Sequence, residues 1–195
     1  MKERPILFSA PMVRAILEGR KTQTRRVVKD LPADVFEEVG RDVLTGEYHF
    51  VKGALGYTRA CRYGERGDRL WVRETWRPAL EHLSECTSSK DVRFAASVSE
   101  AEWAISRWRP SIHMPRWASR INLDVIGVRV ERLQEISEAD ALAEGALQPW
   151  TGLDRGSDTR TARSEFEALW ASINGAESWA ANPWVWVVEF KRVTA

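Results

Sequence analysis

The sequence predicts an α+β fold, a closed or nearly closed mixed β-barrel decorated with short helices. Strand-like segments outnumber helical ones and are spread along the whole chain, and every helical segment is short. These features favour a barrel over a doubly wound sheet, which alternates its strands with helices on both faces. A length of 195 residues fits one domain, so residues 1–195 are expected to share one fold.

The composition is typical of a globular chain and excludes several function classes. Hydrophobic residues make up 44 % and charged residues 29 % of the chain, which argues against intrinsic disorder. No apolar run approaches the roughly 20 residues that cross a bilayer, and no signal peptide is recognisable, so we expect a cytoplasmic protein with no membrane partner. Cys61 and Cys86 fit neither a disulfide framework nor a zinc spacing. No phosphate-binding glycine loop or carboxylate cluster appears, and we expect no metal or cofactor.

The first half of the chain predicts three strands and one helix. Residues 5–8 form an apolar strand segment, and a helix follows over residues 9–19, where Ser9 is a good N-cap and Gly19 a natural stop. Strands are expected at residues 25–28 and 69–76. The second of these alternates so that Leu70, Val72, Glu74 and Trp76 share one face. If that face is the core, the Glu74 carboxylate needs a cation or hydrogen-bond donors.

The second half predicts two strands and two helices. Residues 120–133 form a long strand with an irregularity at Gly127. A helix is expected over residues 137–145, with Asp140 in the capping-box position, and another over residues 161–173 with an apolar stripe. The final segment, residues 184–193, is rich in Val, Trp and Phe and predicts a central strand.

Three stretches interrupt this scaffold and are interpreted as insertions. They lie near residues 30–66, 77–116 and 148–160. The first is rich in glycine and predicts a hairpin. The second contains a possible short helix and ends in a proline-flanked ordered loop. Insertions of this kind could cover a cavity or form a surface for a protein partner.

The segment from Gly19 to Arg26 resembles the signature of the ASCH family in the PUA-like superfamily, Gly-x-Lys-x-x-Glu-x-Arg. Gly19, Lys21 and Arg26 match that pattern, and Thr24 replaces its glutamate. The Gly-Arg-Lys-Thr-x-Thr turn is similar to that of the ASCH branch that hydrolyses the amide of N4-acetylcytidine. The resemblance extends through the Gly-Asp-Arg-Leu turn at residues 67–70 and the aromatic last strand. The stretches PILFSAPMVRAILEGRKTQTRRV, GDRLWVRETW and IHMPRWASRI are similar to a phage and prophage subset of ASCH-like proteins.

The resemblance implies a PUA-like barrel and a catalytic set built on Lys21 and Thr24. A lysine that is partly desolvated loses proton affinity and can act as a base toward a hydroxyl nucleophile such as that of Thr24. The third member in the acetylcytidine branch is a glutamate on a short helix, and Glu144 is its counterpart here. Glu74 is the competing acid, because strand alternation points it inward, and the sequence leaves the choice open.

Binding candidates are cations and aromatic rings, which suit phosphates and bases. Arginine outnumbers lysine, and the chain holds ten tryptophans. Trp71, Trp170, Trp184 and Trp186 lie in periodic segments and are assigned to the core. The residues assigned to substrate binding are Arg20, Arg25, Arg26, Trp76, His113, Arg116 and Trp117.

The function predicted from these features is binding of RNA or a modified nucleoside, with hydrolysis of an acylated cytidine as its enzymatic form. Two alternatives stay open. One is a ribonuclease, because some ASCH relatives cleave RNA. The other is a noncatalytic adaptor in phage biology, in which the insertions bind a protein.

Overall fold

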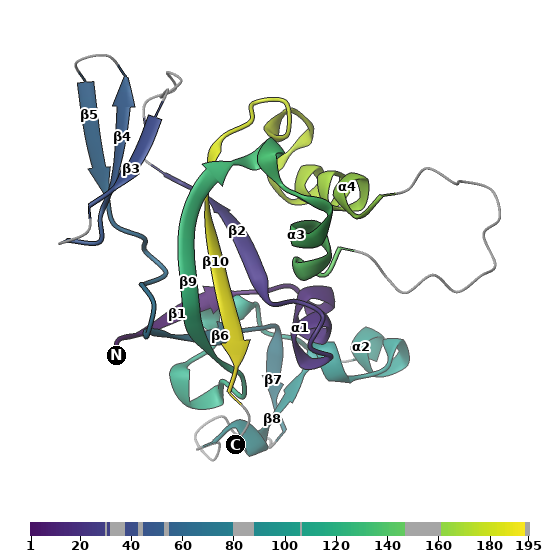
Figure 1. Ribbon diagram of the computed structural model, residues 1–195. Helices are drawn as coiled ribbons and strands as arrows, with labels where there is room; N and C mark the ends of the chain where they lie inside the picture. The colour runs from purple at the N-terminus through teal and green to yellow at the C-terminus, as the bar shows by residue number, and fades with distance from the viewer. Residues whose placement is uncertain are drawn as a thin grey trace.

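A mixed five-stranded sheet forms the centre of the molecule in the computed structural model (Figure 1). Its strands are β1 (Glu3–Leu7), β2 (Gln23–Val27), β6 (Arg69–Arg73), β9 (Asn122–Arg132) and β10 (Trp184–Arg192). They correspond to the five strand segments predicted from the sequence, which confirms the α+β class. The structure describes residues 1–29, 31, 38–42, 45–52, 55–79, 88–105, 107–146 and 161–193.

The sheet has the order β1-β6-β9-β10-β2, with β1 and β6 parallel and every other pair antiparallel. No backbone ladder joins β1 to β2 in the described part of the chain, so a closed barrel is not found. The two edge strands approach through a side chain instead, because Arg26 Nη2 donates a hydrogen bond to the Leu7 carbonyl at 2.7 Å. Among the described residues, β2 is paired with β10 on one side only, so its other edge has no strand partner there.

Strand β10 is central, as predicted, and is buried on both faces. Trp186, Val188 and Phe190 belong to one apolar cluster, whereas Val185 and Val187 belong to another. Strand alternation sends successive side chains to opposite faces of the sheet. The expected irregularity at Gly127 is confirmed, since the pairing of β9 with β10 shifts register between Glu189 and Phe190.

The helices pack on the two faces of this sheet. Helix α1 (Ala10–Leu17) lies with the cluster of Phe190, and α3 (Glu138–Ala143) and α4 (Ala162–Asn174) cover the cluster of Val187. Ser137 caps α3 by accepting from the Asp140 amide at 3.1 Å. The expected capping-box role of the Asp140 side chain is wrong, because that carboxylate pairs with Arg25 and Arg129.

The first insertion contains a hairpin, as predicted. It is a three-stranded antiparallel sheet of β3 (Glu38–Arg41), β4 (Tyr48–Lys52) and β5 (Leu55–Arg59). Tyr48 and Phe50 pack edge-on against Trp186, with ring centroids 5.0 and 6.4 Å away. The hairpin sheet is thus joined to the core of the main sheet.

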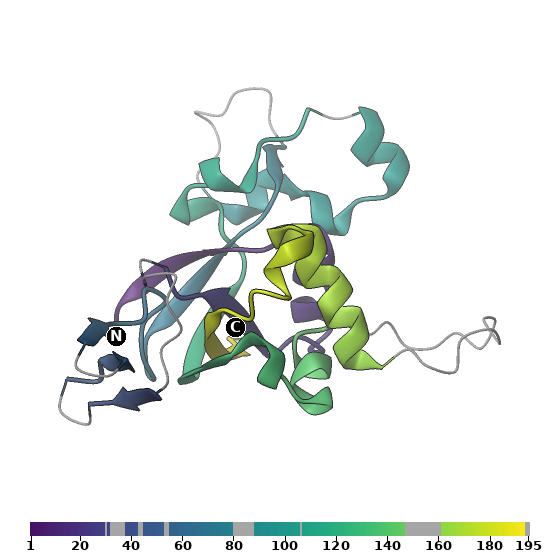
Figure 2. The same ribbon diagram turned by 90° about the horizontal axis from the view of Figure 1, so that it is seen from above.

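The second insertion forms a layer at one end of the main sheet (Figure 2). It contains β7 (Trp76–Pro78), β8 (Val92–Phe94) and α2 (Glu100–Ile105). The expected single strand over residues 69–76 is wrong in its last part, because the chain leaves β6 after Arg73 and starts β7 at Trp76. The expected ordered loop contains two 3₁₀ turns, Ser111–His113 and Arg116–Ala118. The third insertion, near residues 148–160, lies outside the described residues.

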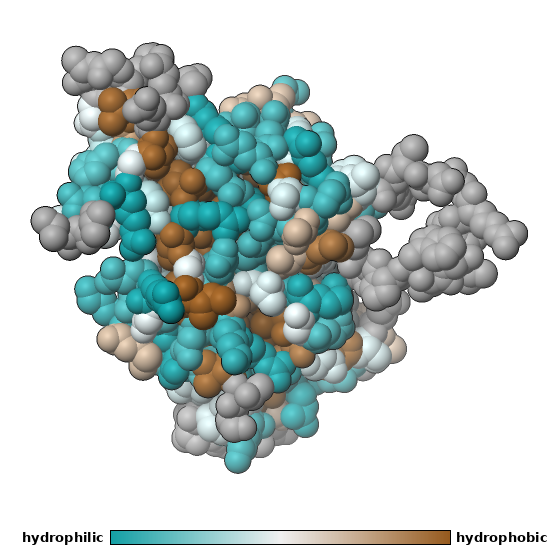
Figure 3. Space-filling view, viewed as in Figure 1, coloured by the Kyte–Doolittle hydropathy of each residue, from teal (hydrophilic) through white to brown (hydrophobic). Residues whose placement is uncertain are grey.

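The surface and the helices show how the chain meets its surroundings. On the face drawn in Figure 3, hydrophobic residues lie in a narrow band among larger hydrophilic areas. None of the described helices is both long and apolar enough to span a bilayer.

Candidate functional site

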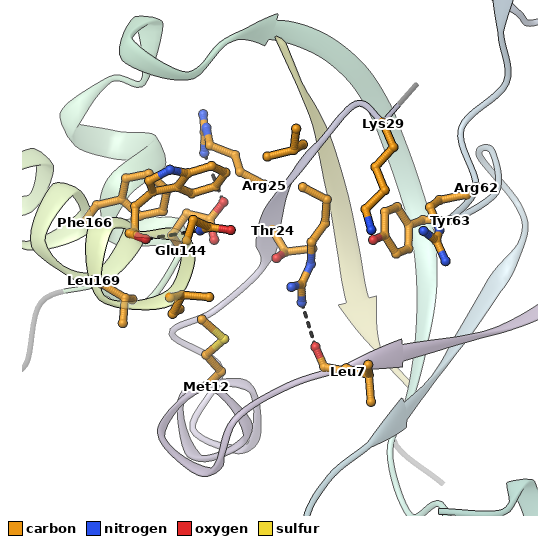
Figure 4. Close-up of a pocket in the computed structure, with 15 residues that line it drawn as sticks. Leu7, Met12, Thr24, Arg25, Lys29, Arg62, Tyr63, Glu144, Phe166 and Leu169 are labelled. Carbon is orange, nitrogen blue, oxygen red and sulfur yellow. Dashed lines mark hydrogen bonds and ion pairs between the residues drawn. The ribbon is translucent and has the colours of Figure 1, made fainter. Parts of the chain in front are cut away.

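A cavity of about 400 Å³ lies at the free edge of β2. Side chains from both faces of β2 border it, since no strand covers this edge among the described residues. The other walls come from α1, the end of α3, α4 and the segment that follows β5 (Figure 4). Its lining residues are Leu7, Met12, Thr24, Arg25, Arg26, Val27, Lys29, Arg62, Tyr63, Glu144, Phe166, Leu169, Trp170, Ile173 and Asn174.

Lys21 and Glu144 form a buried ion pair behind this cavity. Lys21 Nζ donates to Glu144 Oε2 at 2.6 Å and to the Glu144 carbonyl at 2.9 Å. Lys21 is 2 % exposed and Glu144 4 % exposed. The two residues are 123 positions apart in the sequence. The structure therefore brings together the lysine and one of the two glutamates that the sequence proposed.

Local backbone geometry holds this pair in place. The Thr22 amide donates to the Ala143 carbonyl at 2.8 Å, which ties the start of β2 to the end of α3. Gly145 ends α3 with a φ of +77°, a conformation that L side chains rarely adopt. A Cβ at Gly145 would lie 3.0 Å from Ala15 Cβ and 3.3 Å from Lys21 Cβ. Only glycine lets Glu144 approach Lys21 this closely.

Burial lowers the pKa of the Lys21 ammonium below its ordinary value. The charge and hydrogen bond of Glu144 oppose this shift, and the nearby charges of Arg26 and Arg25 reinforce it. Desolvation disfavours the charged form of a lysine, and like charges do the same. The amine is thereby shifted toward the neutral form that can accept a proton.

Arg25 supports the Glu144 carboxylate from the other side. Its Nη1 lies 3.2 Å from Glu144 Oε1, its Nη2 lies 3.1 Å from Asp140 Oδ2, and its Nε donates to Glu131 at 2.9 Å. The side chain is fully buried. Arg25 was predicted to bind substrate, and this assignment needs correction because three carboxylates already occupy its guanidinium. Its contact with Glu144 fixes the position of that carboxylate.

Thr24 lies on β2 between Gln23 and Arg25 and faces the cavity. It is 2 % exposed and lines the wall together with Glu144 (Figure 4). Gln23 and Arg25 point to the opposite face of the strand, where Gln23 Nε2 donates to the Asp140 carbonyl at 2.8 Å. The hydroxyl of Thr24 and the carboxylate of Glu144 therefore both border the cavity, and the buried amine of Lys21 lies behind the carboxylate to which it is bonded.

Glu74 is also a buried acid, but it pairs with Arg120 rather than with Lys21. It is 1 % exposed, and its two oxygens accept from Arg120 Nε and Nη2, each at 2.9 Å. This confirms that its carboxylate faces inward and needs a cation. Burial raises the pKa of Glu74, although Arg120 opposes the shift. Glu74 does not line the cavity, so Glu144 is the acid that lies beside Lys21.

The structure places four predicted binding residues in the second insertion, away from the cavity lining. His113 is exposed, Trp117 is 36 % exposed, and Arg116 pairs with Glu3 at 3.0 Å. The assignment of Trp76 to stacking is wrong, because its indole is 1 % exposed and packs edge-on against Trp117.

Of the three predicted arginines in the β2 turn, only Arg26 presents a cation to the cavity without a carboxylate partner in the described ranges. Arg20 pairs with Glu18 at 2.6 Å and does not line the cavity. The Arg26 guanidinium lies over the Phe8 ring at 5.3 Å. Fewer arginines of this turn are therefore available to bind an anion in the cavity than the sequence predicted.

Sequence reasoning missed the walls of the cavity that come from α4 and from the first insertion. Phe166 and Leu169 belong to the apolar stripe of α4, which was assigned to the core, and that stripe was the available signal. Arg62, Tyr63 and Lys29 carried no local pattern that marked them. Of the core assignments, Trp170 and Trp186 are confirmed by exposures of 5 % and 3 %, whereas Trp71 and Trp184 are half-buried.

The described side chains contain no group of three or more His, Cys, Asp or Glu arranged to hold a metal ion. Lys21, Thr24 and Glu144 instead provide an amine, a hydroxyl and a carboxylate. Comparisons of this chain with protein-family models, curated proteins and solved structures found no match.

Proposed function

We propose that the cavity at β2 binds an N4-acylated cytidine and hydrolyses its amide, in a protein related to the ASCH branch of the PUA-like superfamily. The observation that carries the proposal is the buried pair of Lys21 and Glu144, whose glutamate borders the same cavity as Thr24. An ion pair that only stabilised the fold would not need to border a cavity large enough for a ligand, nor to share that cavity with a hydroxyl group. Such cavities are typically about 300 to 1,000 Å³.

The chemistry follows from the properties of the three groups. Neutral Lys21 accepts the proton of the Thr24 hydroxyl as its oxygen attacks the amide carbonyl carbon. The C–N bond then breaks, and the leaving amine of cytidine takes that proton from Lys21. Lys21 then takes a proton from a water molecule whose oxygen attacks the acyl carbon. The ester C–O bond breaks, the Thr24 oxygen takes the proton from Lys21, and the acyl group leaves as a carboxylic acid that ionises in solution. Glu144 orients Lys21 throughout, and the contact with Arg25 holds the Glu144 carboxylate in place.

The test is hydrolysis of N4-acetylcytidine by variants of the three residues. Lys21→Met and Thr24→Val retain side-chain size and remove the base and the nucleophile, so each is expected to lower kcat by at least a hundredfold. Glu144→Gln is expected to be comparably damaging. Glu74→Gln is the matched control, because that glutamate is equally buried but binds Arg120.

Thermal unfolding of each variant separates lost chemistry from lost folding. Wild-type protein that leaves N4-acetylcytidine intact, or a Lys21→Met variant that remains active, would reject the hydrolase proposal. Binding of cytidine without hydrolysis would leave a noncatalytic nucleoside-binding protein as the function.

A further inference from the structure

The cavity has one end where positive charge is unopposed. Arg26, Lys29 and Arg62 line it, and none of them has a carboxylate within ion-pair distance among the described residues. Arg26 donates a hydrogen bond to the Leu7 carbonyl and lies over the Phe8 ring, and its buried Nε has no hydrogen-bond partner among the described residues. Lys29 and Arg62 are exposed. This contrasts with Arg25, whose charge three carboxylates balance.

The opposite end of the cavity is apolar. Phe166 and Leu169 project from α4, while Thr24 and Glu144 lie between this end and the cations (Figure 4). Lys29, Arg62 and Tyr63 lie together on the other side of Thr24 in the same view. The order across the cavity is thus apolar wall, reactive groups, cations.

This order fits an acylated nucleotide that binds in a single orientation. The acyl group would occupy the apolar end and the amide would meet Thr24. The pyrimidine and sugar would extend toward Tyr63, and a phosphate would lie among Arg26, Lys29 and Arg62. Arginine and lysine are the side chains that bind phosphate most often, through charge-assisted hydrogen bonds. A neutral nucleoside would leave all three cations without a counter-charge.

We infer that the ligand of this cavity carries a phosphate ester, so that the protein acts on the phosphorylated form of an acylated cytidine in preference to the free nucleoside. The inference rests on the proposed function for its substrate. Arg62 and Tyr63 come from the end of the first insertion, which assigns that insertion a part in specificity.

The phosphate could belong to a mononucleotide or to a nucleotide within RNA. A second cavity of about 220 Å³ adjoins the same cations, since Lys29 and Arg62 also line it together with Val28, Arg59, Ala60 and Trp186. A phosphodiester held by these cations could therefore continue into a neighbouring space. The two sources share one chemistry and are separated by the substrates of the test.

The test compares kcat/KM for N4-acetylcytidine, its 5′-monophosphate and a short RNA that contains one acetylated cytidine. The wild-type protein is expected to favour the monophosphate or the RNA over the nucleoside by at least tenfold. The double variant Lys29→Gln/Arg62→Gln is expected to bring that ratio close to one. Arg66→Gln, an exposed arginine outside the cavity lining, is the matched control and is expected to keep the ratio. A higher kcat/KM for RNA than for the monophosphate would identify RNA as the source of the phosphate.

Equal kcat/KM values for nucleoside and phosphorylated substrates would overturn the inference, as would a preference that the double variant retains. If the wild-type protein hydrolyses none of the three substrates, tryptophan fluorescence titration measures its binding of cytidine and of cytidine 5′-monophosphate. This measurement tests the phosphate site independently of hydrolysis. Tighter binding of the monophosphate that the double variant loses would uphold the phosphate site while the hydrolase proposal fails. Equal binding of the two ligands would reject the phosphate site.

Discussion

Lys21 is the residue whose environment departs most from that of an ordinary lysine. Its ammonium is removed from water, and it donates hydrogen bonds to the carbonyl and the carboxylate of Glu144. Burial of a charge is costly unless a partner compensates it, and Glu144 is that partner for Lys21. Arg25 makes a second contact with the same carboxylate, at 3.2 Å.

The lowered pKa of Lys21 predicts how stability depends on pH. Between that lowered pKa and the ordinary lysine value of about 10.4, the unfolded chain binds a proton that the folded chain does not. Stability therefore rises with pH across this window, by up to about 1.4 kcal/mol per pH unit. Urea unfolding at a series of pH values should show wild-type protein gaining stability relative to Lys21→Met as the pH rises toward 10. Parallel curves for the two proteins would contradict the lowered pKa.

At the scale of elements, the site depends on how α3 ends against α1 and β2. The helix is only six residues long, so its position is set by contacts rather than by its own propensity. Gly145 is the point where the three elements meet, because a side chain there would contact both Ala15 and Lys21. The same turn carries Glu144 toward the cavity.

Gly145→Ala is expected to destabilise the protein by more than the roughly 1 kcal/mol that a left-handed conformation alone costs. The additional cost comes from steric crowding, because the new Cβ would lie only 3.0 Å from Ala15 Cβ. Gly19→Ala is the matched comparison, since Gly19 follows helix α1 with the same φ of +77° but has open space around it. Chemical denaturation measures both variants. Equal losses of stability would show that the close approach at Gly145 costs nothing.

At the scale of the molecule, the first insertion belongs to the core of the main sheet. Phe50 is fully buried and lies in the same cluster as Trp186 and Phe190. Tyr48 adds a hydrogen bond from its hydroxyl to the Val128 carbonyl of β9 at 2.6 Å. The hairpin sheet therefore covers one face of β9 and β10, and the chain that leaves it places Arg62 and Tyr63 at the cavity.

Phe50→Ala is expected to lower the free energy of unfolding by about 3 to 5 kcal/mol, the usual cost of removing a buried aromatic side chain. Val51→Ala, at a neighbouring position that is 37 % exposed, should change the free energy of unfolding by much less.

The unfolding of wild-type protein should be a single transition by tryptophan fluorescence and by circular dichroism. A separate early transition in which Phe50→Ala loses only the hairpin would show that the insertion folds apart from the main sheet.

Local patterns in the sequence were sufficient for most of the scaffold. Alternation and β-branched composition located all five strands of the main sheet, and capping residues located α1, α3 and α4 within a few positions. These signals arise from neighbours in the chain, whose spacing follows the periods of helix and strand. They failed at Asp140, whose side chain pairs with Arg25 instead of completing a capping box, and after Arg73, where the strand ends earlier than predicted.

The sequence by itself predicted Lys21, Thr24 and either Glu144 or Glu74 as the candidate catalytic groups, and it located the strands and helices that carry them. Only the tertiary structure decided that the glutamate beside Lys21 is Glu144, that Arg25 is already neutralised, and that Arg62 reaches the same cavity as Thr24. The reason is physical: whether a charge is available depends on its burial and on its partners. Those partners come from elements that lie more than a hundred residues away in the chain and meet only when the sheet is packed.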